Sequence, residues 1–85
     1  ARYPLSLEFV EHAKPRDEYL ADVDVTILEP GGAIALEAIS DGPFLLAKLP
    51  DGKYTVHAEH DGKIETRQVN VSSKNPRQVI FEWRD

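Results

Sequence analysis

Cysteine and methionine are both absent from this sequence of 85 residues. The lack of cysteine excludes disulfides, thiolate zinc sites and cysteine nucleophiles. A translated chain begins with methionine, so we expect that a segment before Ala1 was removed, and a secretory signal peptide is one candidate. We therefore interpret the chain as the C-terminal part of a longer exported precursor that is located in the periplasm. The alternative is a domain cut from a larger cytoplasmic chain.

Long hydrophobic runs and clusters of positive charge are also missing. No apolar stretch approaches the roughly 18 residues that a membrane-spanning helix needs, so we expect no membrane insertion. The net charge is −5, and the ten Lys and Arg residues are dispersed between Arg2 and Arg84. Proteins bind nucleic acid by neutralising phosphates with clustered cations. We therefore expect no nucleic-acid partner.

The sequence does contain a repeated alternation of apolar and polar residues. Leu5, Leu7 and Phe9 alternate with Ser6 and Glu8, which is the period of a half-buried strand. Similar alternations recur along the rest of the chain. Together they predict seven strands, at residues 3–11, 20–29, 33–39, 43–49, 53–59, 63–71 and 77–84.

Turn signals separate these predicted strands. Asp-Gly pairs, which favour tight turns, occur at residues 41–42, 51–52 and 61–62. Seven short strands with a turn about every ten residues are typical of a β-sandwich. We therefore expect an all-β fold, with residues 1–85 forming a single β-sandwich domain.

Two segments depart from this regular pattern. The apolar parity changes within residues 63–71, which predicts a β-bulge near Arg67 and Gln68. Residues 12–18 are compatible either with a single helical turn beginning near Pro15 or with a loop, and the sequence does not distinguish them.

Most aromatic residues fall on the inward parity of the predicted strands, and a domain of this size needs them in its core. Tyr19 is expected to be the exposed exception. The aromatic residues assigned to the inward parity are Tyr3, Phe9, Phe44, Tyr54, Phe81 and Trp83.

Histidines and acidic residues are the candidates for chemistry. His57 and His60 are three residues apart on one predicted strand, so they should point to opposite faces and not chelate one ion together. His12 has no metal-ligand partner at a recognisable spacing. Asp22 and Asp24 should share one strand face, which we interpret as solvated and not as a calcium site or a glycosidase carboxylate pair. We expect no catalytic residue, no metal ligand and no cofactor.

A family resemblance covers about residues 5–84 and rests mainly on residues 42–58. The run Leu49-Pro-Asp-Gly-Lys-Tyr-Thr-Val56 resembles the carboxypeptidase regulatory-like domains, which have a transthyretin-like (prealbumin-like) fold. The resemblance is closest to short, stand-alone exported proteins of proteobacteria, and it implies a seven-stranded Greek-key β-sandwich. In this turn we expect the hydroxyl of Tyr54 to reach a backbone partner.

The resemblance also bears on function. Domains of that family are usually non-catalytic accessories, whereas a transthyretin-like hydroxyisourate hydrolase uses His and Arg residues and ends in Tyr-Arg-Gly-Ser. This chain ends in Phe81-Glu-Trp-Arg-Asp85 and lacks that motif. We expect a non-catalytic binding or accessory module of the bacterial cell envelope, a monomer or weak dimer with a protein or small-ligand partner. The alternatives are a hydrolase built at a dimer interface from His12, His57 or His60, and a carbohydrate-binding module that uses exposed aromatics.

Overall fold

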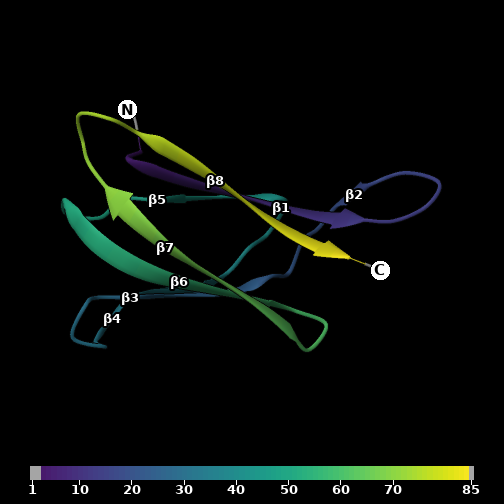
Figure 1. The fold of residues 1–85 in the computed structure, drawn as a ribbon, viewed down its shortest axis with the longest axis horizontal. Coiled ribbons are helices and arrows are strands. Elements are labelled where there is room, and N and C mark those ends of the chain that lie inside the picture. The colour runs from purple at the N-terminus through teal and green to yellow at the C-terminus, as the bar shows by residue number, and fades with distance from the viewer. Residues whose placement is uncertain (1–2, 85) are drawn as a thin grey trace.

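A computed structural model describes residues 3–84 of the chain. All the regular structure in this range is β, and it forms two four-stranded sheets that pack face to face (Figure 1). None of these residues forms a helix that could span a membrane. The all-β sandwich is confirmed, but eight strands are found in the described residues where seven were predicted. They are β1 (Leu5–His12), β2 (Glu18–Tyr19), β3 (Asp24–Leu28), β4 (Ile34–Ile39), β5 (Phe44–Ala47), β6 (Gly52–His60), β7 (Lys63–Val71) and β8 (Arg77–Arg84).

The first sheet is organised around β1. On one side, β8 pairs with β1 in parallel over its whole length, from Leu5 opposite Arg77 to His12 opposite Arg84. On the other side, two short antiparallel strands follow one another, β5 beside the first half of β1 and β2 beside the second half. Phe9 joins the two, because its amide donates to the Pro43 carbonyl at 2.9 Å and its carbonyl accepts from Leu20 at 3.0 Å.

The second sheet is antiparallel, with the strand order β4-β3-β6-β7. The hairpin between β6 and β7 turns at Asp61 and Gly62, whose φ angles are 55° and 79°. Both values lie in the left-handed region, which Asp tolerates and Gly adopts without steric cost. The predicted Asp-Gly turn is therefore confirmed at this position.

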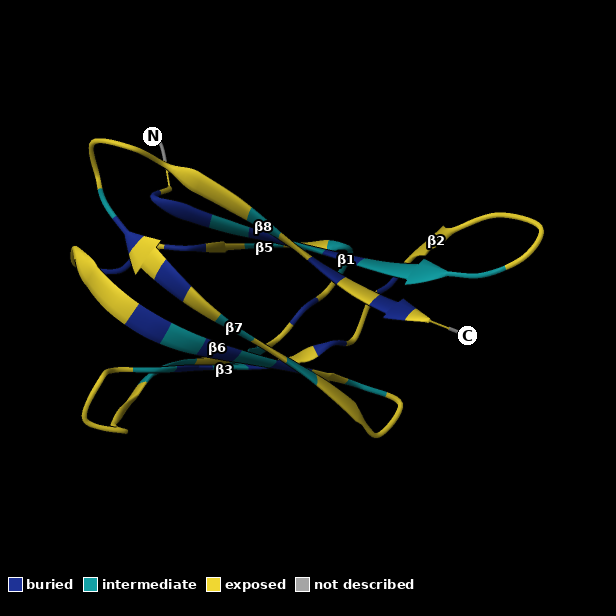
Figure 2. Ribbon diagram, in the orientation of Figure 1, coloured by how far each residue is buried: buried dark blue, intermediate teal, exposed yellow. Residues whose placement is uncertain are grey.

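The core lies between the two sheets and is built from the inward-facing residues of each (Figure 2). Phe9, Phe81 and Trp83 form an aromatic cluster in the first sheet, with ring centroids 6.0 to 6.3 Å apart. Opposite them, Val25, Ile27, Val56 and Ala58 are fully buried on the second sheet. Burial of apolar surface between the two sheets is the main stabilising contribution in a domain without disulfides.

The turn before β6 is closed by Tyr54, as predicted. Its hydroxyl donates a hydrogen bond of 2.7 Å to the carbonyl of Pro50, four residues earlier. Its ring is 8% exposed and packs in the core. A buried tyrosine of this kind contributes apolar area and also satisfies a backbone carbonyl in the turn.

The predicted strand at residues 20–29 is confirmed only over Asp24–Leu28, because the chain is interrupted between β2 and β3. Asp22 adopts a left-handed backbone with φ of 59°. Next to it, Val23 and Ser40 are fully buried and bond to each other twice, from the Val23 amide to the Ser40 hydroxyl and from the Ser40 amide to the Val23 carbonyl. The interruption moves the chain from the first sheet to the second. Residues 13–17 form a loop without a helical turn.

The predicted bulge near Arg67 and Gln68 is also wrong. The register of β6 and β7 continues without a shift from Gly52 opposite Val71 to His60 opposite Lys63. The parity changes because Ile64 faces solvent, whereas Arg67 occupies an inward position. Its guanidinium lies 5.6 Å from the centroid of the Phe81 ring, a cation–π contact that suits a charged side chain at the margin of the core.

Two aromatic assignments fail and the others hold. Phe9, Tyr54, Phe81 and Trp83 are buried and Tyr19 is exposed, as predicted. Phe44 and Tyr3, expected inside, are 52% and 43% exposed. Phe44 pairs with Glu8 of β1, whose side chain is on the outward parity, so the register places Phe44 on the outer face of the first sheet.

Candidate functional site

The outer face of the first sheet carries an exposed apolar surface. The outward parity of β1 places Val10 there, and the strand register puts Tyr19 beside Val10 and both Phe44 and Ile80 beside Glu8. Leu46 extends the surface along β5. We call these residues the apolar face: Val10, Tyr19, Phe44, Leu46 and Ile80.

The exposure of these side chains is high for their type. Tyr19 is 66% exposed, Phe44 52% and Ile80 44%. The rings of Tyr19 and Phe44 contact each other with centroids 6.1 Å apart, although the residues come from β2 and β5. Large apolar side chains gathered on one sheet face are costly in water, which makes this face a candidate contact surface.

Carboxylates border the apolar face. A groove of about 390 Å³ runs over β1, β2 and β8. Val10, His12, Tyr19 and Ile80 line it together with four acidic residues, and no Lys or Arg is among its lining residues. The acidic residues are Glu8, Asp17, Glu18 and Glu82. The groove therefore combines apolar surface with negative charge.

His12 is held between two of these carboxylates at the end of β1. Its Nδ1 lies 2.9 Å from Asp17 and its Nε2 lies 2.7 Å from Glu82. The hydrogen bonds to Glu82 and Asp17 raise the pKa of His12 above its usual value of 6.5, because both carboxylates favour the protonated ring. Lys14 and Arg84 line the adjoining hollow. In this arrangement His12 ties the loop before β2 to β1 and β8.

We expect the contribution of His12 to stability to depend on pH. Since its folded pKa is raised, the stabilisation is fully present below the unfolded pKa of 6.5 and is lost as the pH rises through the folded pKa. Urea unfolding of the parent and of His12→Gln should show a gap between their free energies of unfolding at about pH 5.5, and this gap should close by about pH 9. His57→Gln, on the other sheet, is the matched control. A gap that persists unchanged at high pH would contradict the charge-based account.

The other two histidines do not join His12. His57 and His60 lie on opposite faces of β6, as predicted from their spacing. His57 is on the outer face and bonds to the Thr66 hydroxyl at 2.8 Å, whereas His60 contacts the edge of the Trp83 ring at a centroid distance of 5.9 Å. Within one chain the three histidines form no common site.

Asp22 and Asp24 do not share a strand face. Asp22 precedes β3 in its left-handed conformation, whereas Asp24 is the first residue of that strand. Both are exposed. Throughout residues 3–84, no group of three His, Asp or Glu side chains is arranged to hold a metal ion.

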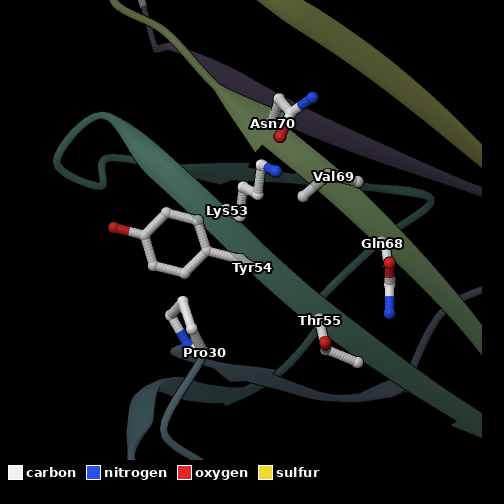
Figure 3. Close-up of a pocket in the computed structure, with 7 residues that line it drawn as sticks. All are labelled: Pro30, Lys53, Tyr54, Thr55, Gln68, Val69 and Asn70. Atoms are coloured by element: carbon white, nitrogen blue, oxygen red, sulfur yellow. The ribbon is translucent and has the colours of Figure 1, made fainter.

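A second hollow, of about 490 Å³, lies over the start of β6 and the end of β7 (Figure 3). Pro30, Tyr54 and Val69 line it together with polar side chains, and Lys53 is its only charged residue. The Tyr54 hydroxyl is already committed to Pro50, so this ring has a structural role. The groove on the first sheet, with its apolar and charged residues together, is therefore the better candidate site.

The contacts of His12 are not apparent from the sequence. Glu82 lies 70 positions further along the chain, and the two meet only because β8 pairs with β1 in parallel. A local signal could not have revealed the arrangement, since it depends on strand pairing across the whole domain.

The chain is similar to a known protein family. Residues 5–81 match the model of the family described as the Rhizobiales growth-associated tandem repeat domain. No curated protein matches the chain.

Proposed function

This chain belongs to the Rhizobiales growth-associated tandem repeat domain family, and from that membership we propose that it is a non-catalytic contact module of the bacterial cell envelope. The observation that carries the proposal is the apolar face, which leaves Tyr19, Phe44 and Ile80 in solvent. A domain that occurs in tandem presents such a face several times on one polypeptide. Repeated weak contacts of this kind combine into strong attachment.

The charge of the groove supports a proposal about the chemistry of the partner. Four carboxylates surround apolar side chains and no Lys or Arg is among the lining residues of the groove, so a complementary partner carries Lys or Arg beside apolar residues. We propose that the partner presents such a cationic, apolar segment of protein. His12 is protonated more readily than an ordinary histidine, which moderates the negative charge near β8.

We expect a short peptide of alternating lysine and valine to bind this groove. In NMR titrations it should shift the signals of Val10, Tyr19 and Phe44, and a glutamate–valine peptide should not. Phe44→Ser combined with Glu18→Lys should weaken binding roughly tenfold, or about 1.4 kcal/mol. Both positions are exposed, so the fold should be retained.

The matched control changes the same residue kinds on the other sheet. Ile39 and Glu37 lie on β4 and are also exposed. Ile39→Ser with Glu37→Lys should leave peptide binding unchanged. Equal losses in both double variants, or equal binding of the acidic peptide, would exclude the groove as a specific contact site.

The exposed aromatic pair favours carbohydrate binding as a second candidate. Tyr19 and Phe44 are adjacent and accessible, and aromatic faces are surfaces on which sugar rings pack. A glycan array separates the two functions, because selective glycan binding that is lost in Phe44→Ser would favour the carbohydrate.

We also propose that the protein is exported and works in the periplasm. A role associated with growth in Rhizobiales bacteria fits the envelope, which a growing cell must enlarge. Cells expressing the full-length gene should release a shortened protein on osmotic shock. Recovery of an unshortened protein in the cytosol alone would overturn this compartment.

The transthyretin-like Greek-key assignment remains part of the proposal. It is supported by the Leu49–Tyr54 turn, in which the tyrosine hydroxyl bonds to the Pro50 carbonyl.

A further inference from the structure

The chain enters and leaves this fold at opposite ends of its long axis. β1 and β8 run in parallel in full register, from Leu5 opposite Arg77 to His12 opposite Arg84. The start of β1 and the end of β8 are therefore separated by the length of an eight-residue strand, about 26 Å. Figure 1 shows the start of β1 and the end of β8 toward opposite sides of the longest dimension, which is 39 Å against 27 and 19 Å for the others.

In a tandem array, this geometry determines where the next copy lies. The following copy begins where the β8 of the first copy ends. Its own β1 starts at that point, and its own β8 ends at the opposite end of its fold. With short connections the copies are thus placed one after another along the long axis. A side-by-side arrangement in the same orientation would require the connection to run back along the whole domain, and one in the opposite orientation would require the next copy to fold back against the first.

The two ends of the domain carry opposite charge. At the end where β1 starts, residues 29–33, 48–53 and 72–77 have four cations and two carboxylates. At the end where β8 finishes, residues 13–24, 40–43 and 59–63 together with Arg84 have seven carboxylates and four cations. All of these charged side chains are exposed.

The cations of the first end are available for a partner. In the described part of the chain, the ion pairs involve only His12, Asp17, Glu65, Arg67 and Glu82. Lys48, Lys53, Lys74 and Arg77 therefore have no carboxylate partner within residues 3–84.

We infer that consecutive copies of this domain pack end to end, with the basic end of one copy against the acidic end of the copy before it. The carboxylates that the basic end meets are those of the loops beside the end of β8, among them Asp22, Asp41 and Asp61, which are exposed. These three residues do not line the groove on the first sheet, so the contact leaves the apolar faces accessible along the array.

The test uses two copies joined directly, Asp85 to Ala1. The natural lack of cysteine allows one label per copy, introduced by Glu37→Cys on the exposed outer side of β4. Spin-label distance measurements should give one narrow peak near 39 Å, the long dimension of the domain, whereas side-by-side packing would give about 19 to 27 Å. In small-angle scattering, the two-copy protein should have a radius of gyration of about 23 Å, as expected for two bodies of 12.8 Å radius of gyration with centres 39 Å apart.

Charge variants test the contact itself. Lys48→Glu with Lys74→Glu in the second copy should broaden the distance peak roughly twofold, and so should about 1 M salt, which screens exposed charges. Thr66→Glu, on the outer side of β7 opposite His57 of β6, should have no effect. A peak below about 30 Å, or a broad distribution that neither salt nor charge reversal changes, would overturn end-to-end packing.

Discussion

Replacing Tyr54 with alanine should lower the free energy of unfolding by about 3–5 kcal/mol, as aromatic-to-alanine changes in a core do. Such a loss is a large share of the total stability of a small domain. The ring is 8% exposed, and its hydroxyl donates to the Pro50 carbonyl at 2.7 Å. The change therefore leaves a cavity and removes the bond that closes the turn before β6. Equilibrium unfolding in urea measures the loss.

Tyr54→Phe separates the two contributions. It keeps the ring and removes only the hydroxyl, so it should cost about 1 kcal/mol. A Tyr54→Ala midpoint within error of the parent would show that the ring is not part of the core.

Alanine at Phe9 and alanine at Phe44 should have very different effects. Phe9 is fully buried beside Phe81 and Trp83, and its removal should cost about 3–5 kcal/mol. Phe44 is 52% exposed, so its removal should change stability by no more than about 0.5 kcal/mol. Both variants are compared with the parent by urea unfolding. Similar losses for the two variants would mean that Phe44 is buried, for instance in a dimer.

The contrast between these phenylalanines shows what local patterns predict. The strands at both ends of the chain, and the β6–β7 hairpin, follow from alternation and turn residues, because a strand's period and an Asp-Gly turn are local properties. Which face of the sheet a residue of a short strand occupies is not determined by the local sequence. Phe44 faces outward because it pairs with Glu8 of β1. The four residues of β5 are too few for an alternation of apolar and polar residues to indicate this.

Two further departures from the prediction likewise depend on contacts between segments that are distant in the sequence. The inward position of Arg67 could not be recognised from sequence, because its support is the Phe81 ring in the other sheet. A polar residue at an inward position was therefore interpreted as a bulge. Likewise, the break at Asp22 depends on the buried hydroxyl of Ser40, which the sequence places 17 positions after Val23.

The candidate site was the least predictable part of the molecule. Tyr19 was correctly expected in solvent, but its neighbours Phe44 and Ile80 come from β5 and β8. The side chains of these residues come together on one face of the sheet only after β1 has paired with strands on both of its sides. A site of this kind is a property of sheet topology, and single-sequence patterns do not contain it.

The parallel pairing of the first and last strands has a mechanical consequence. A force pulling the two ends of the domain apart acts along β1 and β8 in opposite directions, and it slides one strand against the other. The hydrogen bonds between these strands then bear the load together, whereas in a hairpin pulled from its open end they would break one after another. The pairing extends over eight residue pairs, so the first sheet resists extension as a unit. A polypeptide with several such domains in series can therefore carry tension without any one domain opening first at its edge.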